Sequence, residues 1–264
     1  MAAFACLGLR SRWTSEVERK LVMTRSGVER FLDAVAPWIH EEIYDAARPV
    51  AYARTTYLDT DRLEYFRSGR TGSFHRRLRI REYASAQDLA GAPALTGACF
   101  LELKENAGPL RHKVRFASTP DRIDQIVRSH GELEESTAEL GLLARRLRAD
   151  RPTPRVTTWY RRSSFADADC RVRITVDSGI ELCGPVSPGA AGSLAEPPTV
   201  LGRVDGWIVE LKHAGQPPEW LARAVSRLPP ARGLSKFALG MRAMAAITTL
   251  PGGARRGARA LVGG

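Results

Sequence analysis

The stretch RRLRIREY, residues 76–83, has the pattern that decides the fold. In an extended chain, successive side chains point to opposite faces, so Arg77, Arg79 and Arg81 share one face while two aliphatic residues share the other. An ordinary strand buries its apolar face and exposes mixed charges to water. Three arginines in one row indicate a surface that binds an anion.

The same alternation recurs in other segments that read as strands. Basic residues that share such rows are Lys20, Arg77, Arg79, Arg81, Lys104, Lys113, Arg115, Arg162, Arg171, Arg173 and Lys212. The acidic residues of these rows are fewer, namely Glu16, Glu18, Glu102 and Glu210. For a single strand, a solvated outer face would explain the pattern. Its repetition along the chain favours one basic surface that all these strands share.

These rows predict an inside-out barrel. A closed antiparallel barrel of about eight strands leaves an interior that holds side chains or one slender ligand. If the charged rows point inward, the interior is a basic tunnel, and helices must cover the apolar outer faces. We therefore expect an α+β fold, a closed antiparallel β-barrel with a charged interior. Because buried cations are costly without a partner, the tunnel should hold water and an anionic ligand.

Phosphate chains suit such a tunnel, because arginine forks match phosphate oxygens and lysines add point charge. The few acids then need an explanation. Glu210, with Glu18 or Glu16, could hold a divalent cation that phosphate oxygens also coordinate. The alternative for Glu210 is an internal salt bridge to a neighbouring Arg or Lys. Positioned phosphates, cations and a bridging metal are what phosphoryl transfer requires.

Composition sets the outer bounds of the chain. Its 264 residues are 44% apolar, and 40 Lys and Arg against 29 Asp and Glu give a net charge of +11, which attracts polyanions. The four cysteines form no metal-finger spacing, which fits a reduced, cytoplasmic protein. No stretch is apolar enough to cross a bilayer, so a partner protein would have to bring the chain to a membrane. No helix-turn-helix or RNP-like pattern supports binding of nucleic acid.

The chain reads as one domain with two extensions. We expect a disordered leader over residues 1–13, one domain over residues 14–248 and a disordered basic tail over residues 249–264. Helical periodicity marks four segments of the domain: residues 26–47 with Ser26 as N-cap and a break at Pro37, residues 119–150 with Thr119 as N-cap, residues 217–228 and residues 235–247.

Eight short motifs, in this order, resemble the VTC domain of polyphosphate polymerases, within the triphosphate tunnel metalloenzyme superfamily. They are ERK at 18–20, LRIREY at 78–83, FLELK at 100–104, HKVRF at 112–116, YRRSSF at 160–165, RVRITVD at 171–177, VELK at 209–212 and SKF at 235–237. The resemblance implies an eight-stranded antiparallel tunnel in which the terminal phosphoryl group of ATP or another nucleoside triphosphate extends inorganic polyphosphate or pyrophosphate.

The resemblance also implies a role for individual residues. Those that would bind the reacting phosphates are Lys20, Arg79, Arg81, Lys104, Lys113, Arg162 and Arg173. Those that would contact the triphosphate or the growing chain are Tyr160, Lys212, Ser235 and Lys236. Glu210, with Glu18 and Glu16 as further candidates, would hold Mn²⁺ or Mg²⁺. Arg77 rests on strand alternation alone.

Two alternatives to polymerisation stay open. Residues 16–20 also fit the ExExK signature of the related CYTH triphosphatases, in which paired glutamates help bind metal for hydrolysis. The YRRSSF and SKF motifs resemble the polymerase branch instead. A protein that binds polyphosphate or another polyanion without turnover is the third interpretation.

Overall fold

The computed structural model describes residues 12–14, 17–71, 74–107, 110–132, 137–188, 198–226, 228 and 234–248. Glu16, residues 1–11 of the expected leader and the expected tail lie outside this part of the chain. Residues 12 and 13, which we assigned to the leader, belong to a strand in the structure. The elements are β1 (Arg12–Thr14), β2 (Val17–Met23), α1 (Arg25–Val35), η1 (Ala36–Trp38), β3 (Ile39–Glu41), β4 (Val50–Asp59), α2 (Glu64–Thr71), β5 (Phe74–Ala86), β6 (Ala94–Ala107), β7 (Leu110–Ser118), α3 (Pro120–Arg128), α4 (Ala138–Asp150), β8 (Thr153–Asp167), β9 (Val172–Cys183), β10 (Val200–Arg203), β11 (Trp207–His213), α5 (Glu219–Ser226) and α6 (Lys236–Thr248).

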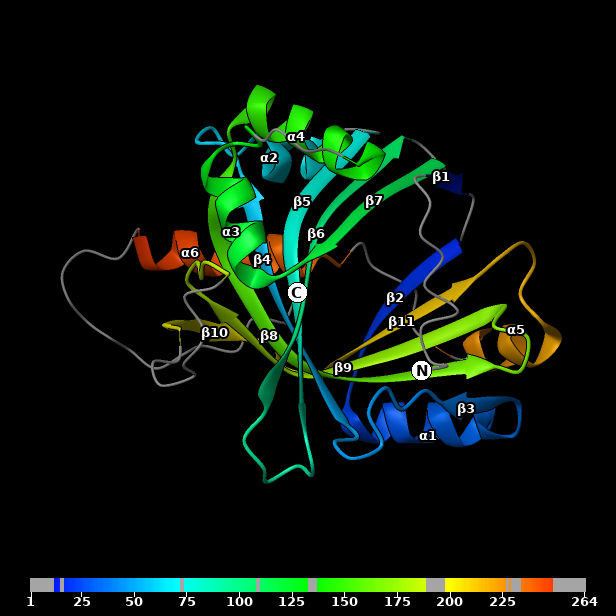
Figure 1. Cartoon of the computed structure of the whole chain (residues 1–264). Helices are drawn as coiled ribbons and strands as arrows, with labels where there is room; N and C mark the ends of the chain where they lie inside the picture. The colour runs from blue at the N-terminus through cyan, green and yellow to red at the C-terminus, as the bar shows by residue number, and fades with distance from the viewer. Residues whose placement is uncertain are drawn as a thin grey trace.

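The eleven strands of the described residues form one antiparallel, strongly curved sheet with helices on its convex side (Figure 1). The main strand order is β1-β7-β6-β5-β4-β8-β9-β11-β2, with β10 beside β9 and β3 beside β8. The α+β class, the antiparallel sheet and the outer helices are therefore confirmed.

The expectation of a closed barrel of eight strands is corrected. Among the described residues, the two end strands of the sheet, β1 and β2, do not pair with each other. Instead β1 pairs with the free edge of β7, from Arg12 opposite Lys113 to Thr14 opposite Arg111. A hydrogen bond from Arg111 to Glu18, 2.7 Å long, links β7 to β2. Side chains rather than a backbone ladder therefore join the two ends of the sheet, which is a curled half-barrel.

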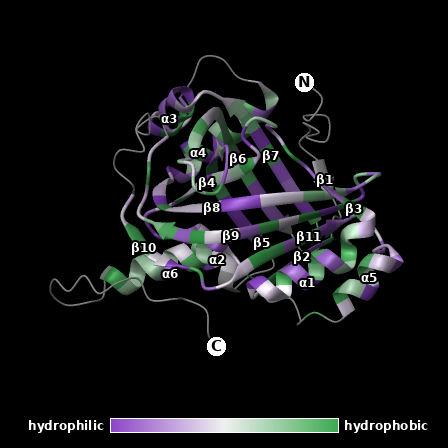
Figure 2. Cartoon of the chain, turned by 90° about the horizontal axis from the view of Figure 1, so that it is seen from below, coloured by the Kyte–Doolittle hydropathy of each residue, from purple (hydrophilic) through white to green (hydrophobic). Residues whose placement is uncertain are grey.

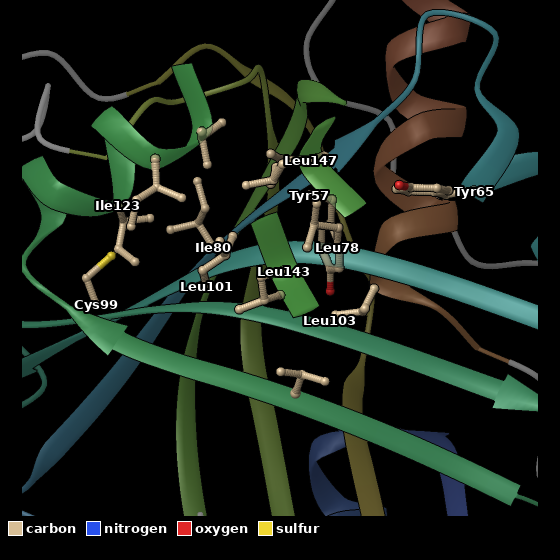
Figure 3. Close-up of a cluster of buried hydrophobic side chains, with 14 of the residues drawn as sticks. Tyr57, Tyr65, Leu78, Ile80, Cys99, Leu101, Leu103, Ile123, Leu143 and Leu147 are labelled. Atoms are coloured by element: carbon tan, nitrogen blue, oxygen red, sulfur yellow. The ribbon is translucent and has the colours of Figure 1, made fainter. Parts of the chain in front are cut away.

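Apolar side chains on the convex side make the core. Leu78 and Ile80, the aliphatic residues of the RRLRIREY stretch, are buried beside Leu101 of β6 (Figure 3). The helices α3 and α4 cover them with Ile123 and Leu143. The arginines that alternate with these aliphatic residues must therefore point to the concave side. Colouring by hydropathy shows hydrophilic segments on β6, β7 and β8 (Figure 2).

The remaining helices cover the rest of the sheet. Buried apolar residues of α1 and α5, among them Phe31 and Leu221, pack with Ile174 of β9 and Leu211 of β11. None of the helices in the described ranges is both long and apolar enough to span a bilayer.

The local helix predictions are partly confirmed. Thr119 caps α3 by accepting a hydrogen bond from the backbone of Arg122, as expected. The cap of α1 is Thr24 rather than Ser26, because the Thr24 hydroxyl accepts from the backbone of Gly27. After α1 the chain turns through η1, which contains Pro37, and enters strand β3 instead of a second helix.

Candidate functional site

The concave side of the sheet encloses a cavity of about 570 Å³, which we call the basic cavity. Its walls are side chains from the alternating rows together with the start of α6. Predicted site residues that line it are Lys20, Arg79, Arg81, Lys104, Lys113, Tyr160, Arg162, Arg173, Glu210, Lys212, Ser235 and Lys236. Arg77 lines it as well. Arg171, which the alternation placed in the same rows, is exposed in the turn before β9.

Glu102 lies at the centre of one group of cations in the basic cavity. Its carboxylate, with 1% of the side chain exposed, is 2.6 Å from Arg79 and 3.0 Å from both Lys113 and Arg115. Burial would raise the pKa of Glu102, but the charge of Arg79 and then of Lys113 holds this pKa well below its ordinary range. Glu102 is therefore ionised and neutralises part of the basic row.

Asp177 neutralises a second group. Its side chain is fully buried, and it accepts hydrogen bonds of 2.6 and 2.8 Å from Arg162 and one of 2.5 Å from Lys236. Burial opposes its ionisation, yet Arg162 and Lys236 lower the pKa of Asp177 below its ordinary value. Sequence reasoning assigned no role to this residue.

Glu18 and Glu210 form a third group with two lysines. Lys20 forms a salt bridge with Glu18 and lies 3.4 Å from Glu210, while Lys212 lies 3.2 Å from Glu210 and 3.8 Å from Glu18. Burial works against ionisation of Glu210, and the charge of Lys20 and then of Lys212 lowers its pKa well below the ordinary range. The internal salt bridge that the sequence left open for Glu210 is thus present.

The same pair of carboxylates fits a divalent cation that phosphate oxygens complete. Burial and then the charge of Glu210 act to raise the pKa of Glu18, the latter as expected when two negative charges lie close together, although Lys20 and then Lys212 lower this pKa overall. No cluster of three His, Cys, Asp or Glu suited to a metal occurs in the described residues. Mg²⁺ commonly uses one or two carboxylates together with substrate phosphates, so Glu18 and Glu210 suffice for a metal that arrives with its substrate.

Four cations of the basic cavity form no salt bridge with a carboxylate within the described ranges, namely Arg48, Arg77, Arg81 and Lys104. Arg81 donates a 2.9 Å hydrogen bond to the phenol of Tyr160, and its buried Nε makes no hydrogen bond. Lys104 lies opposite Arg77 on β5 and opposite Lys113 on β7. Burial and then the charge of nearby cations lower the pKa of Lys104 well below its ordinary value. An anion would find its strongest uncompensated attraction here.

Aromatic side chains line another part of the basic cavity. The Arg115 guanidinium lies 3.7 Å from the ring centroid of Phe100 and donates a 3.0 Å hydrogen bond to the Tyr83 phenol. Although burial raises the pKa of Tyr83, Arg81 and then Arg115 lower it to about 8. This phenol therefore changes charge close to the physiological range.

Three functional residues were missed by sequence reasoning, and each had a signal. Glu102 belonged to a charged row but received no role. Tyr83 continues the alternation of Arg77, Arg79 and Arg81 by one more step. Asp177 closes the RVRITVD motif and continues the alternation of Arg173 along β9, which runs to Cys183.

The arrangement suits the binding of an extended phosphate anion. Apart from Arg48, the cations that surround the cavity come from β2, β5, β6, β7, β8, β9, β11 and α6. Buried carboxylates hold several of them in place. A nucleophile from the protein is not needed if one phosphate attacks another, because alignment and charge neutralisation then supply the rate.

Comparison with known proteins agrees with the motifs. The family model described as the VTC domain matches residues 15–245. Among curated protein sequences, none matches the chain significantly. Similar solved structures include a candidate adenylate cyclase of Bacillus halodurans, with 14% identity, 84% of this chain and 95% of that chain covered and a TM-score of 0.48. Another is the PH1819 protein of Pyrococcus horikoshii, with 13% identity, 86% and 98% covered and a TM-score of 0.43.

Proposed function

The chain belongs to the VTC domain family, and from this membership and the chemistry of the basic cavity we propose that it is a metal-dependent polyphosphate polymerase. It would transfer the terminal phosphoryl group of ATP to the end of a polyphosphate chain held in the basic cavity. The observation that carries the proposal is the continuous row Arg77, Arg79 and Arg81, which faces the cavity opposite Lys104. The proposed reaction takes place in the cytoplasm.

Each step of the transfer has a residue to support it. Arg81 and Lys104 would bind phosphate oxygens first, because neither forms a salt bridge with a carboxylate among the described residues. A terminal oxygen of the acceptor chain then forms a bond to the γ-phosphorus, the bond between that phosphorus and the bridging oxygen breaks, and its electron pair leaves with ADP. Arg162 and Lys236, held by Asp177, would stabilise the charge that develops on the transferred group.

Glu210 and Glu18 are the proposed metal ligands. When bound, Mn²⁺ or Mg²⁺ would neutralise part of the charge on the phosphates. Lys20 and Lys212, which pair with these carboxylates in the protein alone, would then turn toward phosphate. The two carboxylates would thus exchange their lysine partners for the metal, and the two lysines would exchange their carboxylate partners for phosphate.

Hydrolysis of a triphosphate is the second candidate function. It is favoured by the position of Glu18 beside Glu210, as the ExExK signature implied. Hydrolysis needs a water molecule in place of the acceptor phosphate, and the same cations would serve both reactions. Only the products distinguish the two.

The test is to incubate the protein with ATP and Mn²⁺ and to separate the products by size. Long-chain polyphosphate together with ADP would support the polymerase. Free phosphate without chain growth would establish the hydrolase, and binding of triphosphate without turnover would establish a binding protein. A parallel reaction with a chelator tests whether the metal is required.

A further inference from the structure

Asp177 connects three elements around the basic cavity. It lies on β9, opposite Arg162 of β8 in the sheet register, and accepts two hydrogen bonds from this guanidinium. Lys236, the first residue of α6, donates to the same carboxylate. No part of the Asp177 side chain is exposed. Its position therefore fixes two cations that come from different elements.

The helix that carries Lys236 is held tightly on its other side. Phe237 stacks on Tyr57 with ring centroids 5.1 Å apart, and Gly240 lies so close to β8 that a Cβ would be 2.6 Å from a methyl group of Val156. Because packing fixes the body of α6, the direction of the Lys236 side chain depends on the group that accepts its hydrogen bond. That partner is Asp177.

The two cations that Asp177 holds converge on one phenol. The Lys236 Nζ is 4.7 Å and the Arg162 Cζ 5.3 Å from the ring centroid of Tyr160, while Arg81 donates to the Tyr160 hydroxyl. Three cations from three elements thus surround a single ring at the wall of the basic cavity. Such a group can contact several oxygens of one phosphate.

We propose that Asp177 is a positioning residue that holds Arg162 and Lys236 around Tyr160 in the geometry that phosphoryl transfer requires. Asp177 is not among the residues that line the cavity, so it would act through the two cations that it holds. The effect that we expect on turnover rests on the proposed function. The effect that we expect on binding rests only on affinity for an inorganic phosphate chain.

The proposal predicts opposite effects on binding and on turnover. Asp177→Asn keeps the size of the side chain but removes the charge that neutralises two cations, so an anion meets a stronger positive potential. Binding of tripolyphosphate should become about tenfold tighter, because a charge-assisted hydrogen bond is gained without competition. The cations are no longer fixed in place, so kcat should fall by about 100-fold, as expected when alignment is lost.

A matched control exists in the same sheet. Arg54 and Glu82 form an equally bidentate buried pair between β4 and β5, with 5% of each side chain exposed, and neither lines the basic cavity. Glu82→Gln therefore removes one carboxylate from a buried pair without touching the site. It should lower Tm while leaving tripolyphosphate affinity and kcat within about twofold of the parent protein, because strand alternation places the Glu82 side chain on the face of β5 opposite to Arg81 and Tyr83.

Calorimetry with inorganic tripolyphosphate measures binding, and polyphosphate synthesis from ATP measures kcat. Tighter binding with lower kcat in Asp177→Asn supports the proposal. Weaker binding, or values like those of Glu82→Gln, would overturn it. If Asp177→Asn does not fold, Asp177→Glu keeps the charge on a longer side chain, and unchanged affinity with reduced kcat is then required. If the parent protein forms no polyphosphate, the proposed function fails. The calorimetric comparison of tripolyphosphate affinity still tests the role of Asp177 in that case.

Discussion

Replacing Lys104 and Lys113 one at a time with Met compares two lysines that face each other across β6 and β7. Both line the basic cavity, and both were expected from the sequence to bind phosphate. They differ in their surroundings. Lys113 lies 3.0 Å from Glu102 and has 45% of its side chain exposed, whereas Lys104 forms no salt bridge in the part of the chain that the structure describes, although the charge of Glu210 also acts on it.

These surroundings predict unequal losses of affinity. A charge-assisted hydrogen bond from Lys104 to phosphate should contribute about 1.5–3 kcal/mol, so Lys104→Met should weaken tripolyphosphate binding by about 10- to 100-fold. Lys113 must give up part of its contact with Glu102 before it binds phosphate. Because an exposed pair contributes at most about 1 kcal/mol, Lys113→Met should weaken binding by less than about fivefold.

The stability of the protein without ligand should change in the opposite sense. Burial and neighbouring cations lower the pKa of Lys104 well below its ordinary value of 10.5, which means that folding disfavours its charged form. Lys104→Met removes this cost and should raise Tm. The gain in Tm should therefore be fully present at pH values below the folded-state pKa of Lys104 and should vanish as the pH rises to 10.5, the ordinary value.

Calorimetry at fixed salt and a thermal melt of each variant test this reasoning. Affinity and Tm must move in opposite directions for Lys104→Met. Equal losses of affinity for the two variants, or a lower Tm for Lys104→Met, would refute the view that unpartnered cations define the binding site.

Three further results are expected. Glu210→Gln should reduce polyphosphate synthesis by more than about 100-fold, because a metal held by Glu210 would act mainly in the transition state. The affinity for tripolyphosphate, measured without metal, should change by less than about tenfold. Against the effect of burial, Arg81 lowers the pKa of Tyr83 to about 8, so tripolyphosphate affinity should fall above that pH as a phenolate forms, and Tyr83→Phe should remove the decline in a calorimetric pH series. Gly240→Ala should lower the free energy of unfolding by about 1–3 kcal/mol in denaturant titrations, because its Cβ would lie 2.6 Å from Val156.

The alternation of charged and aliphatic residues was enough to predict the inner face of the sheet. Arg79 and Arg81 line the basic cavity while Leu78 and Ile80 are buried on the other side, because side chains in a strand alternate without exception unless a bulge intervenes. The residue types on one strand thus determine the face on which each side chain lies.

Two features depended on contacts that no single strand encodes. The ends of the sheet stay apart because β1 takes the edge of β7, a pairing of only three residues that carries little sequence signal. The pairing of Asp177 with Lys236 joins residues 59 positions apart, and it depends on where α6 packs against β8. Alternation shows which way a side chain points, but tertiary packing decides what it meets.

The buried carboxylates beside the cavity act as counterions that belong to the chain itself. A groove of free Arg and Lys side chains sheds a mobile ion for nearly every phosphate it binds, which makes affinity fall steeply with salt. Here Glu102 and Asp177 already occupy the place of those ions. Binding a phosphate chain is therefore an exchange between internal and external anions. Its salt dependence should reflect the few cations without internal partners rather than the whole basic row.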